Sequence, residues 1–230
     1  MPLRSKPMSH LRTLLLALVV ALTLSACASS APPDEYAYFN SPNMRSVLVL
    51  PPANRTTAAQ APDLFYTSLA VPLTRAGFYV FPSQLTQQLL RDQGIIDGAQ
   101  LESVDPRRFY DLFGADMVLQ TTLVAWDTSY LVIGGSVTVA AQYQLVSTHT
   151  GEVVWQANER QSVNTGGDSS SLLGALLETA LNTAQQDYIP LAREMNRRAF
   201  SSLPHGPYHP RFISAAARAD IPQSEQDDAR

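Results

Sequence analysis

The pattern of apolar and polar positions predicts strands alternating with helices in the first half of the chain. The stretch 46–50 is apolar after its first residue and stops at a pair of prolines, which indicates a strand buried on both faces. From Asp63 the leucines recur at helical spacing, so we expect a helix with Asp63 as its N-cap and a kink at Pro72. A short strand at 78–81 and helices at 83–93 and 105–113 complete this half.

The second half of the predicted domain has the period of antiparallel strands. Apolar and polar residues alternate from 136 to 147, which gives the strand one buried face and one solvated face. A strand at 117–126 precedes this segment, and a turn at 148–151 leads to a strand at 152–158. We therefore expect an α/β fold, a single three-layer-like domain with a mixed sheet. Its N-terminal strands are parallel and its C-terminal strands form an antiparallel meander.

The longest helical pattern lies near the C-terminus. An apolar stripe from Leu173 to Met195, within residues 172–202, predicts a long C-terminal helix that bends or breaks at Pro190. We expect the stripe up to Tyr188 to cover one face of the sheet. After residue 203 prolines and glycine exclude a helix, and from residue 219 the polar, acidic composition is typical of disorder.

The first 27 residues have the pattern of a secreted precursor. Basic residues precede an apolar run at 14–24, which has the length of a signal-peptide core and is shorter than the ~20 apolar residues of a transmembrane helix. Two small residues then precede Cys27. This arrangement resembles the lipobox of bacterial lipoproteins, in which cleavage before the cysteine leaves it as the acylated first residue. A secretory peptide with an incidental cysteine is the alternative.

These boundaries divide the chain into four parts. They are a lipoprotein signal peptide at 1–26, a lipidated tether at 27–45, an α/β periplasmic domain at 46–203, and a proline-rich segment with a disordered tail at 204–230. Within the tether we expect Tyr36, Tyr38 and Phe39 to pack on the domain, and a docking strip for a partner is the alternative.

The net charge and the cysteine content limit which partners and cofactors are possible. The net charge is −4, and loss of the basic signal peptide makes the mature chain more acidic, which argues against nucleic acid as a partner. Cys27 is the only cysteine, so its acylation leaves no thiol for a disulfide or a metal. We expect no cofactor other than the covalent diacylglycerol and N-acyl chain on Cys27.

Residues with metal-binding or anion-binding chemistry form no convincing site. His205 and His209 are four residues apart, but the surrounding prolines and glycine exclude the helix that would aim both at one metal. No third ligand is close to them in the sequence. Gly166-Gly167 suits either an anion-binding nest or a plain loop that leads into a helix.

Catalytic patterns are equally weak. Asp116 and Asp127 flank one predicted strand at opposite ends and cannot act as an acid–base pair, and Asp116 is expected to cap the start of that strand. No serine lies in a nucleophile elbow. We therefore expect a protein that is not an enzyme.

Three stretches carry a resemblance to known proteins: SVLVLPPAN at 46–54, FGADMVL at 113–119 and LVSTHTGEVVW at 145–155. Together they resemble the α/β periplasmic domain at the N-terminal end of the Tol translocation beta-propeller protein, and the same pattern occurs in the curli-secretion lipoprotein. With LLGAL at 172–176 and the tail at 206–212, nearly the whole mature chain is similar to a family of bacterial lipoproteins of unknown function. A genome-derived neisserial antigen typifies this family. The resemblance implies an outer-membrane lipoprotein that assists export beside a curli-secretion-like pore.

Three functions remain open at this point. The first is a non-catalytic, membrane-tethered accessory protein that binds a protein partner, either a curli-secretion-like pore or a second copy. The second is a module that binds a small ligand or cell-wall glycan through the loops at Asn54 and Gly166, and the third is a hydrolase with an unrecognised site. For the first, Tyr208 and Phe212 are the candidate interface residues, because large aromatics in a rigid proline-rich frame suit interface anchors. Alternatively, their segment wraps back and closes the core.

We predict that Cys27→Ala leaves an unacylated precursor that no longer partitions with membranes. The physical reason is that stable anchoring needs more than one acyl chain, and this cysteine is the only attachment point for the diacylglycerol. Detergent phase separation of the parent and the variant measures the effect. Equal partitioning of the two proteins would show that the lipobox interpretation is wrong.

Overall fold

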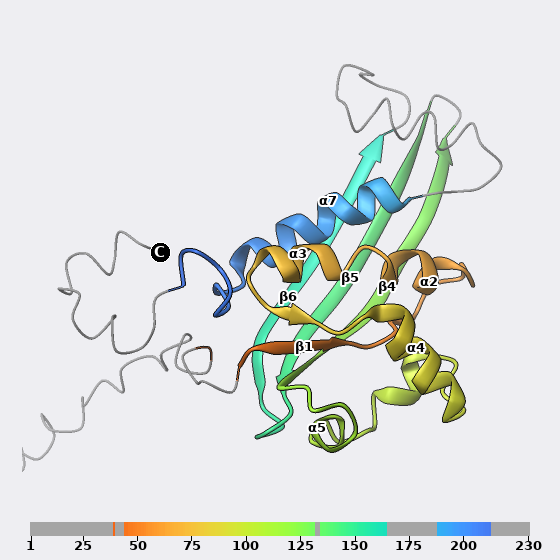
Figure 1. Cartoon of the computed structure of the whole chain (residues 1–230). Helices are drawn as coiled ribbons and strands as arrows, with labels where there is room; N and C mark the ends of the chain where they lie inside the picture. The colour runs from red at the N-terminus through yellow and green to blue at the C-terminus, as the bar shows by residue number, and fades with distance from the viewer. Residues whose placement is uncertain (1–38, 40–43, 132–133, 165–187, 213–230) are drawn as a thin grey trace, which may run out of the picture. The chain divides into compact units, whose positions relative to one another are not determined.

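The computed structural model describes residue 39 and residues 44–131, 134–164 and 188–212 (Figure 1). All of these belong to one compact unit, 36–230. The predicted signal peptide, Cys27, most of the tether, the helical pattern at 172–187 and the tail from 213 lie outside the described residues.

The centre of the fold is a mixed six-stranded sheet with the order β3-β1-β4-β5-β6, in which β2 also pairs with β4. Strand β1 runs parallel to β3 and β4, whereas β4, β5 and β6 form an antiparallel meander. This confirms the predicted α/β class and sheet type. The strands are β1 (Ser46–Val49), β2 (Ala53–Asn54), β3 (Tyr79–Val80), β4 (Met117–Leu131), β5 (Gly134–Ser147) and β6 (Val153–Asn164).

The three meander strands extend beyond the predicted bounds. The register of β4 and β5 continues from Trp126↔Val139 to Leu131↔Gly134, and that of β5 and β6 continues to Ser136↔Asn164. The bounds were predicted from the alternation of apolar and polar side chains. Hydrogen bonding between strand backbones does not require that alternation, so the strands continue after it ends.

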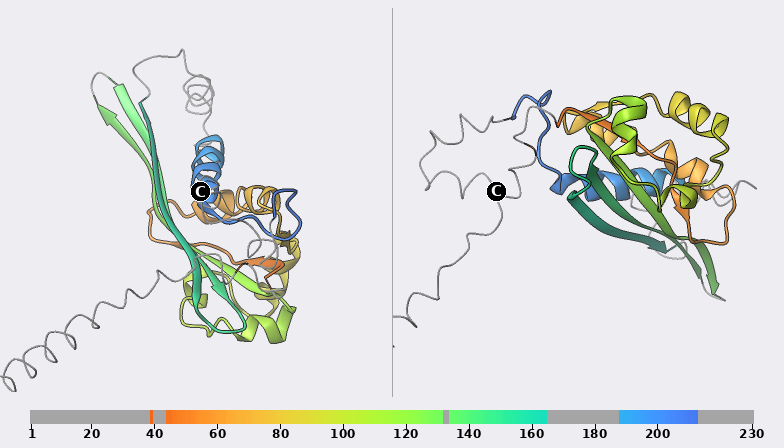
Figure 2. Two further views of the ribbon diagram at one scale, coloured as in Figure 1. Left: turned by 90° about the vertical axis from the view of Figure 1, so that its left-hand side faces the viewer. Right: turned by 90° about the horizontal axis from the view of Figure 1, so that it is seen from below.

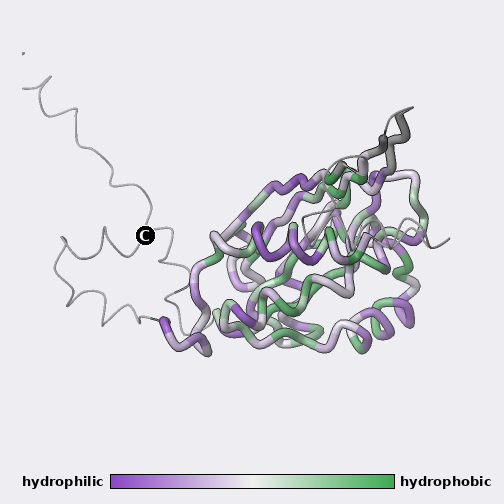
Figure 3. The backbone as a smooth tube through the Cα atoms, turned by 90° about the horizontal axis from the view of Figure 1, so that it is seen from above, coloured by the Kyte–Doolittle hydropathy of each residue, from purple (hydrophilic) through white to green (hydrophobic). Residues whose placement is uncertain are grey.

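Helices cover both faces of the sheet, although unequally. Helices α2 (Ala61–Tyr66), α3 (Ala70–Arg75) and α7 (Ile189–Ala199) lie on one face, over the main core (Figure 2). At one end of the opposite face, α4 (Ser83–Asp92), α5 (Arg108–Phe113) and the 3-10 helix η1 (Gly98–Leu101) enclose a smaller cluster around Leu48, Leu50 and Phe109. Hydrophilic and hydrophobic residues alternate around the helices (Figure 3), as expected when one helix face rests on a sheet.

Prolines set the helix boundaries more sharply than predicted. The helix expected from Asp63 is divided into α2 and α3, and Pro72 lies in the first turn of α3. N–H groups in the first turn of a helix have no carbonyl partner within it, so proline loses no hydrogen bond at this position. The predicted cap was wrong: the N-cap is Gln60, and Asp63 lies in the first turn behind Pro62. Pro190 likewise lies in the first turn of α7, which begins at Ile189, and the part of the predicted helix before it lies outside the described residues.

Two predicted contacts are confirmed near the start of β1. The Asp116 carboxylate accepts hydrogen bonds from the backbone N–H groups of Arg45 and Ser46 at 3.1 and 3.0 Å, so it joins the starts of β1 and β4. Phe39 is buried against Phe78, with ring centroids 6.1 Å apart, so the core begins before residue 46.

A buried polar network holds the helix layer onto the sheet. The side-chain amide of Asn196, on α7, is fully buried. Its Oδ1 accepts a hydrogen bond from the Tyr143 hydroxyl of β5 at 2.5 Å, and its Nδ2 donates to Ser68 Oγ at 2.7 Å. Ser68 Oγ in turn donates to the carbonyl of Phe65 at 2.6 Å, which connects the turn between α2 and α3 to the same network.

We predict that Asn196→Leu lowers the free energy of unfolding by about 2–4 kcal/mol, because both the Tyr143 hydroxyl and Ser68 Oγ lose a partner while buried. Urea unfolding followed by tryptophan fluorescence measures the effect. As a control, Tyr143→Phe combined with Asn196→Leu should cost less than the two single changes added together. Strict additivity would contradict a coupled network.

Candidate functional site

The helix layer carries an apolar groove of about 800 Å³ between α3 and α7. These two helices lie side by side in Figure 1. The groove has walls of apolar side chains from both helices. Val71, which is 54% exposed, is the most exposed apolar residue of the lining. Other apolar lining residues are Pro72, Ala76, Pro190, Phe200 and Leu203.

Arginines border this groove, and not all of them are neutralised. Arg197 donates to both carboxylate oxygens of Glu194, at 2.5 and 2.8 Å, and this hydrogen bonding, helped by Arg198, lowers the pKa of Glu194 to about 2. Within the described part of the chain, Arg75 and Arg193 form no ion pair. The groove therefore combines apolar walls with two guanidinium groups available to an acidic ligand.

The proline-rich segment closes one end of the groove. The N–H of Gly206 donates to the carbonyl of Ala76 at 2.7 Å and that of Tyr208 donates to the carbonyl of Gly77 at 3.0 Å, so the segment wraps back onto the end of α3. His205 lines the groove. The Tyr208 side chain stays outside the core and is 64% exposed, whereas Phe212 is half-buried. Both candidate interface residues thus lie on a segment that is docked next to the groove.

The two histidines of this segment stack on each other. Their ring centroids are 3.7 Å apart at 14°, and burial, followed by the charges of His209 and Arg211, lowers the pKa of His205. Across the described ranges, no group of three or more metal-ligating side chains is present. The pair is therefore packed as a structural element of the segment.

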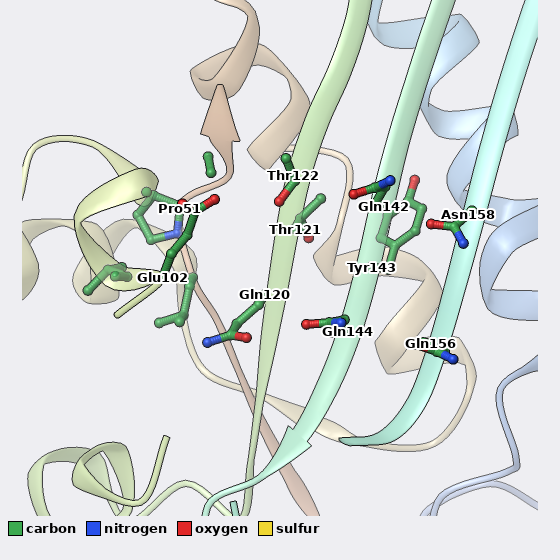
Figure 4. A pocket seen from close by; sticks show the side chains of 14 residues that line it. Pro51, Glu102, Gln120, Thr121, Thr122, Gln142, Tyr143, Gln144, Gln156 and Asn158 are labelled. Atoms are coloured by element: carbon green, nitrogen blue, oxygen red, sulfur yellow. The ribbon is translucent and has the colours of Figure 1, made fainter. Parts of the chain in front are cut away.

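A second groove, of about 450 Å³, lies on the opposite face of the sheet and is polar (Figure 4). Its floor consists of side chains from three adjacent strands. Gln120, Gln144 and Gln156 form one row across β4, β5 and β6, because they are register partners in the two antiparallel pairs. Thr122, Gln142 and Asn158 form the next row in the same way.

Sequence reasoning missed this second site. It predicted that residues 136–147 have one solvated face, which is confirmed, but it treated that face as plain surface. The available signal was the amide side chain at alternate positions of two neighbouring predicted strands, at 142, 144, 156 and 158. Only the register reveals that these amides, with Gln120, lie in rows.

The loops at Asn54 and Gly166 were the candidate ligand-binding loops, and they form no binding site within the described residues. The Asn54 side chain is used within its own loop: Oδ1 accepts hydrogen bonds from the N–H and the hydroxyl of Thr56, and Nδ2 donates to the carbonyl of Ala58. This loop is therefore internally satisfied. Gly166-Gly167 lies outside the described residues.

Comparison with known proteins shows the family to which this chain belongs. Residues 34–205 match the family described as "Putative lipoprotein GNA1162-like", and the chain belongs to this family. It is 29% identical over 194 residues to a Neisseria meningitidis serogroup B protein named "Putative lipoprotein NMB1124/NMB1162", with 84% of this chain and 90% of that protein covered. The predicted family resemblance is confirmed.

One solved structure supports the same fold. The crystal structure of lipoprotein GNA1162 from Neisseria meningitidis is 30% identical, with a TM-score of 0.53, and the match covers 60% of this chain and 96% of that one. The PelC dodecamer from Paraburkholderia phytofirmans matches more distantly, at 18% identity and a TM-score of 0.41, over 69% of this chain and 86% of that one. In the described part of this chain, no helix has both the length and the apolar character needed to cross a bilayer.

We predict that Gly77→Ala releases the proline-rich segment, whereas Gly94→Ala does not. Both glycines have positive φ, so alanine costs about 1–2 kcal/mol at either position. A Cβ at Gly77 would also lie 2.4 Å from the backbone nitrogen of His209, whereas a Cβ at Gly94 meets nothing within 4 Å.

Limited trypsin digestion measures the effect, since Arg211 lies on this segment. We expect faster cleavage after Arg211 and a lower melting temperature in Gly77→Ala than in Gly94→Ala. Identical digestion in the two variants would contradict the docking of the segment at Gly77.

Proposed function

We propose that this protein is a non-catalytic lipoprotein, anchored in the outer membrane through acyl chains on Cys27, whose domain faces the periplasm and binds a protein partner. In this role it is an accessory component of a curli-like export or envelope assembly system. Membership of a lipoprotein family and the lipobox support the anchor. Ala28 and Ser29 after the cysteine support the outer membrane as destination, since an aspartate just after the cysteine is the inner-membrane retention signal in enteric-type sorting.

The groove between α3 and α7 is the observation that carries partner binding. An apolar groove on a folded domain is a place where another apolar surface can be desolvated, and exposed apolar patches of this kind mark interaction sites. Arg75 and Arg193 at its border add charge selectivity. The partner is therefore a segment of another envelope protein that offers apolar side chains together with a carboxylate.

Tyr208 and Phe212 extend this surface. The Tyr208 ring is exposed to solvent, and its backbone is held by a hydrogen bond to the carbonyl of Gly77, so little backbone entropy is lost when a partner covers the ring. An exposed aromatic ring on a fixed backbone is typical of an interface anchor. A second copy of the chain is the competing occupant that the experiment distinguishes.

Photo-crosslinking in living cells tests the proposal, with a photoreactive amino acid at Val71 in the full-length protein. We expect a crosslinked product with one heavier protein, whose mass identifies it. The matched control is the same amino acid at Leu112, which is 71% exposed on α5 and does not line the groove. Equal crosslinking from both positions would show non-specific contact, and a product of twice the chain mass would assign the groove to self-association.

We predict that Arg193→Glu, and separately Tyr208→Ala with Phe212→Ala, reduce the Val71 crosslink at least several-fold without lowering the melting temperature by more than a few degrees. Reversal of charge at Arg193 repels the expected carboxylate, and removal of the two rings removes the anchors. A fall of many degrees in the aromatic variant, with crosslinking intact in the folded fraction, would assign both rings to the core and contradict their interface role.

A further inference from the structure

The polar groove on the far face of the sheet has a composition that packing alone does not explain. Its floor contains five carboxamides and one threonine hydroxyl in two rows of three, and Figure 4 shows all six side chains rising from the three strands toward one space. Four of the amides, Gln142, Gln144, Gln156 and Asn158, are exposed. On the other face of the same strands, Leu119, Tyr143 and Leu145 are buried in the main core.

The amide side chains of the floor form no hydrogen bond within the part of the chain that the structure describes. Adjacent glutamines in neighbouring strands can bond to each other in ladders. Here, none of the five amides forms a hydrogen bond with another described side chain, and all five line the groove. Each carboxamide offers two donors and an acceptor with two lone pairs, so the floor presents both kinds of hydrogen-bonding group at close spacing.

The charge of the groove selects against ionic ligands. Among the fourteen lining residues, Glu102 is the one with a formal charge, and its carboxylate is paired with Arg55 at 2.6 Å. The site therefore has neither a free cation for an anionic ligand nor an unpaired carboxylate for a cationic one. A ligand that fits is neutral and carries many donors and acceptors of its own.

The six side chains of the floor form a grid, and its dimensions limit the size of the ligand. Strands in a sheet lie about 4.8 Å apart, and alternate residues on one strand are about 6.8 Å apart, so the grid covers about 10 by 7 Å. This is the footprint of two linked sugar rings. One wall is formed by Pro51, by Leu101 of η1 and by Glu102, which follows η1.

We propose that this groove is a binding site for a neutral oligosaccharide chain, held by hydrogen bonds between its hydroxyl or acetamido groups and the amide grid. The site is separate from the α3–α7 groove and goes beyond the proposed partner binding. Its affinity is low, because the aromatic residue of the lining, Tyr143, has its side chain buried and donates its hydroxyl to Asn196, so no ring stacks on the sugar.

Ligand-observed saturation-transfer NMR tests the proposal on the full-length acylated protein, in a detergent that has no sugar headgroup. The probes are the neutral hexasaccharides chitohexaose and cellohexaose, and the comparison ligands are hexagalacturonate and the deacetylated, cationic form of chitohexaose. We expect saturable binding of at least one neutral probe and weaker binding of both charged ones. No saturable binding of either neutral probe, or tighter binding of a charged one, would overturn the proposal.

Matched variants locate the site. Gln144 is the middle of one row, and Gln144→Met keeps the length of the side chain but removes its donors and acceptor, so the dissociation constant should rise about tenfold. Gln88→Met makes the same change at an exposed position on α4 outside the groove and should have no effect. Equal effects of the two variants would place binding elsewhere and overturn the assignment.

Two further readouts separate this proposal from its competitors. Melting temperatures should be unchanged in both variants, because both positions are exposed. Concentration-dependent self-association that Gln144→Met abolishes would assign the face to a second copy and overturn the glycan site. The Val71 crosslink should be unaffected by Gln144→Met, so failure of one proposal leaves the other measurable.

Discussion

The amide of Asn196 is the interaction on which the arrangement of the helix layer depends. A buried amide is tolerated only when its donors and acceptor are satisfied, and here the partners come from different elements: the Tyr143 hydroxyl from β5 and Ser68 Oγ from the turn between α2 and α3. An apolar contact would permit α7 to slide along the sheet, whereas these directional bonds permit one position. That position determines the distance between α3 and α7, and so creates the groove between them.

The two-residue period in the middle of β5 then gives the two faces of the sheet different chemistry. Ala141, Tyr143 and Leu145 are buried in the main core, and the residues between them, Gln142 and Gln144, are amides. The helices α4, α5 and η1 cover only the end of the second face near β1, where Leu48, Leu50 and Val118 form their small cluster. The rest of that face keeps its polar side chains and needs no covering layer. The same domain thus has an apolar groove with arginines on one face and a neutral polar groove on the other.

The family is one of lipoproteins, and the described domain shows no cluster of metal ligands. The carboxylates and histidines with partners stabilise structure: Asp116 joins β1 to β4, Glu194 neutralises arginines of α7, and the two histidines stack in the docked segment. The two grooves remain as surfaces that other molecules can reach.

The sequence by itself determined the α/β class, the mixed sheet and the family, because these depend on local periodicity, on turn residues such as Gly151 and on contiguous motifs. It also indicated Asp116 as a cap and Phe39 as a core residue, since each acts close to an element that the pattern predicts. Only the tertiary structure decided the two surfaces. Val71 and Arg193 are 122 positions apart in the chain and line one groove, and no local pattern encodes that distance. Gln120, Gln144 and Gln156 form a row only because strand register aligns them, and register is set by the long-range pairing of β4, β5 and β6.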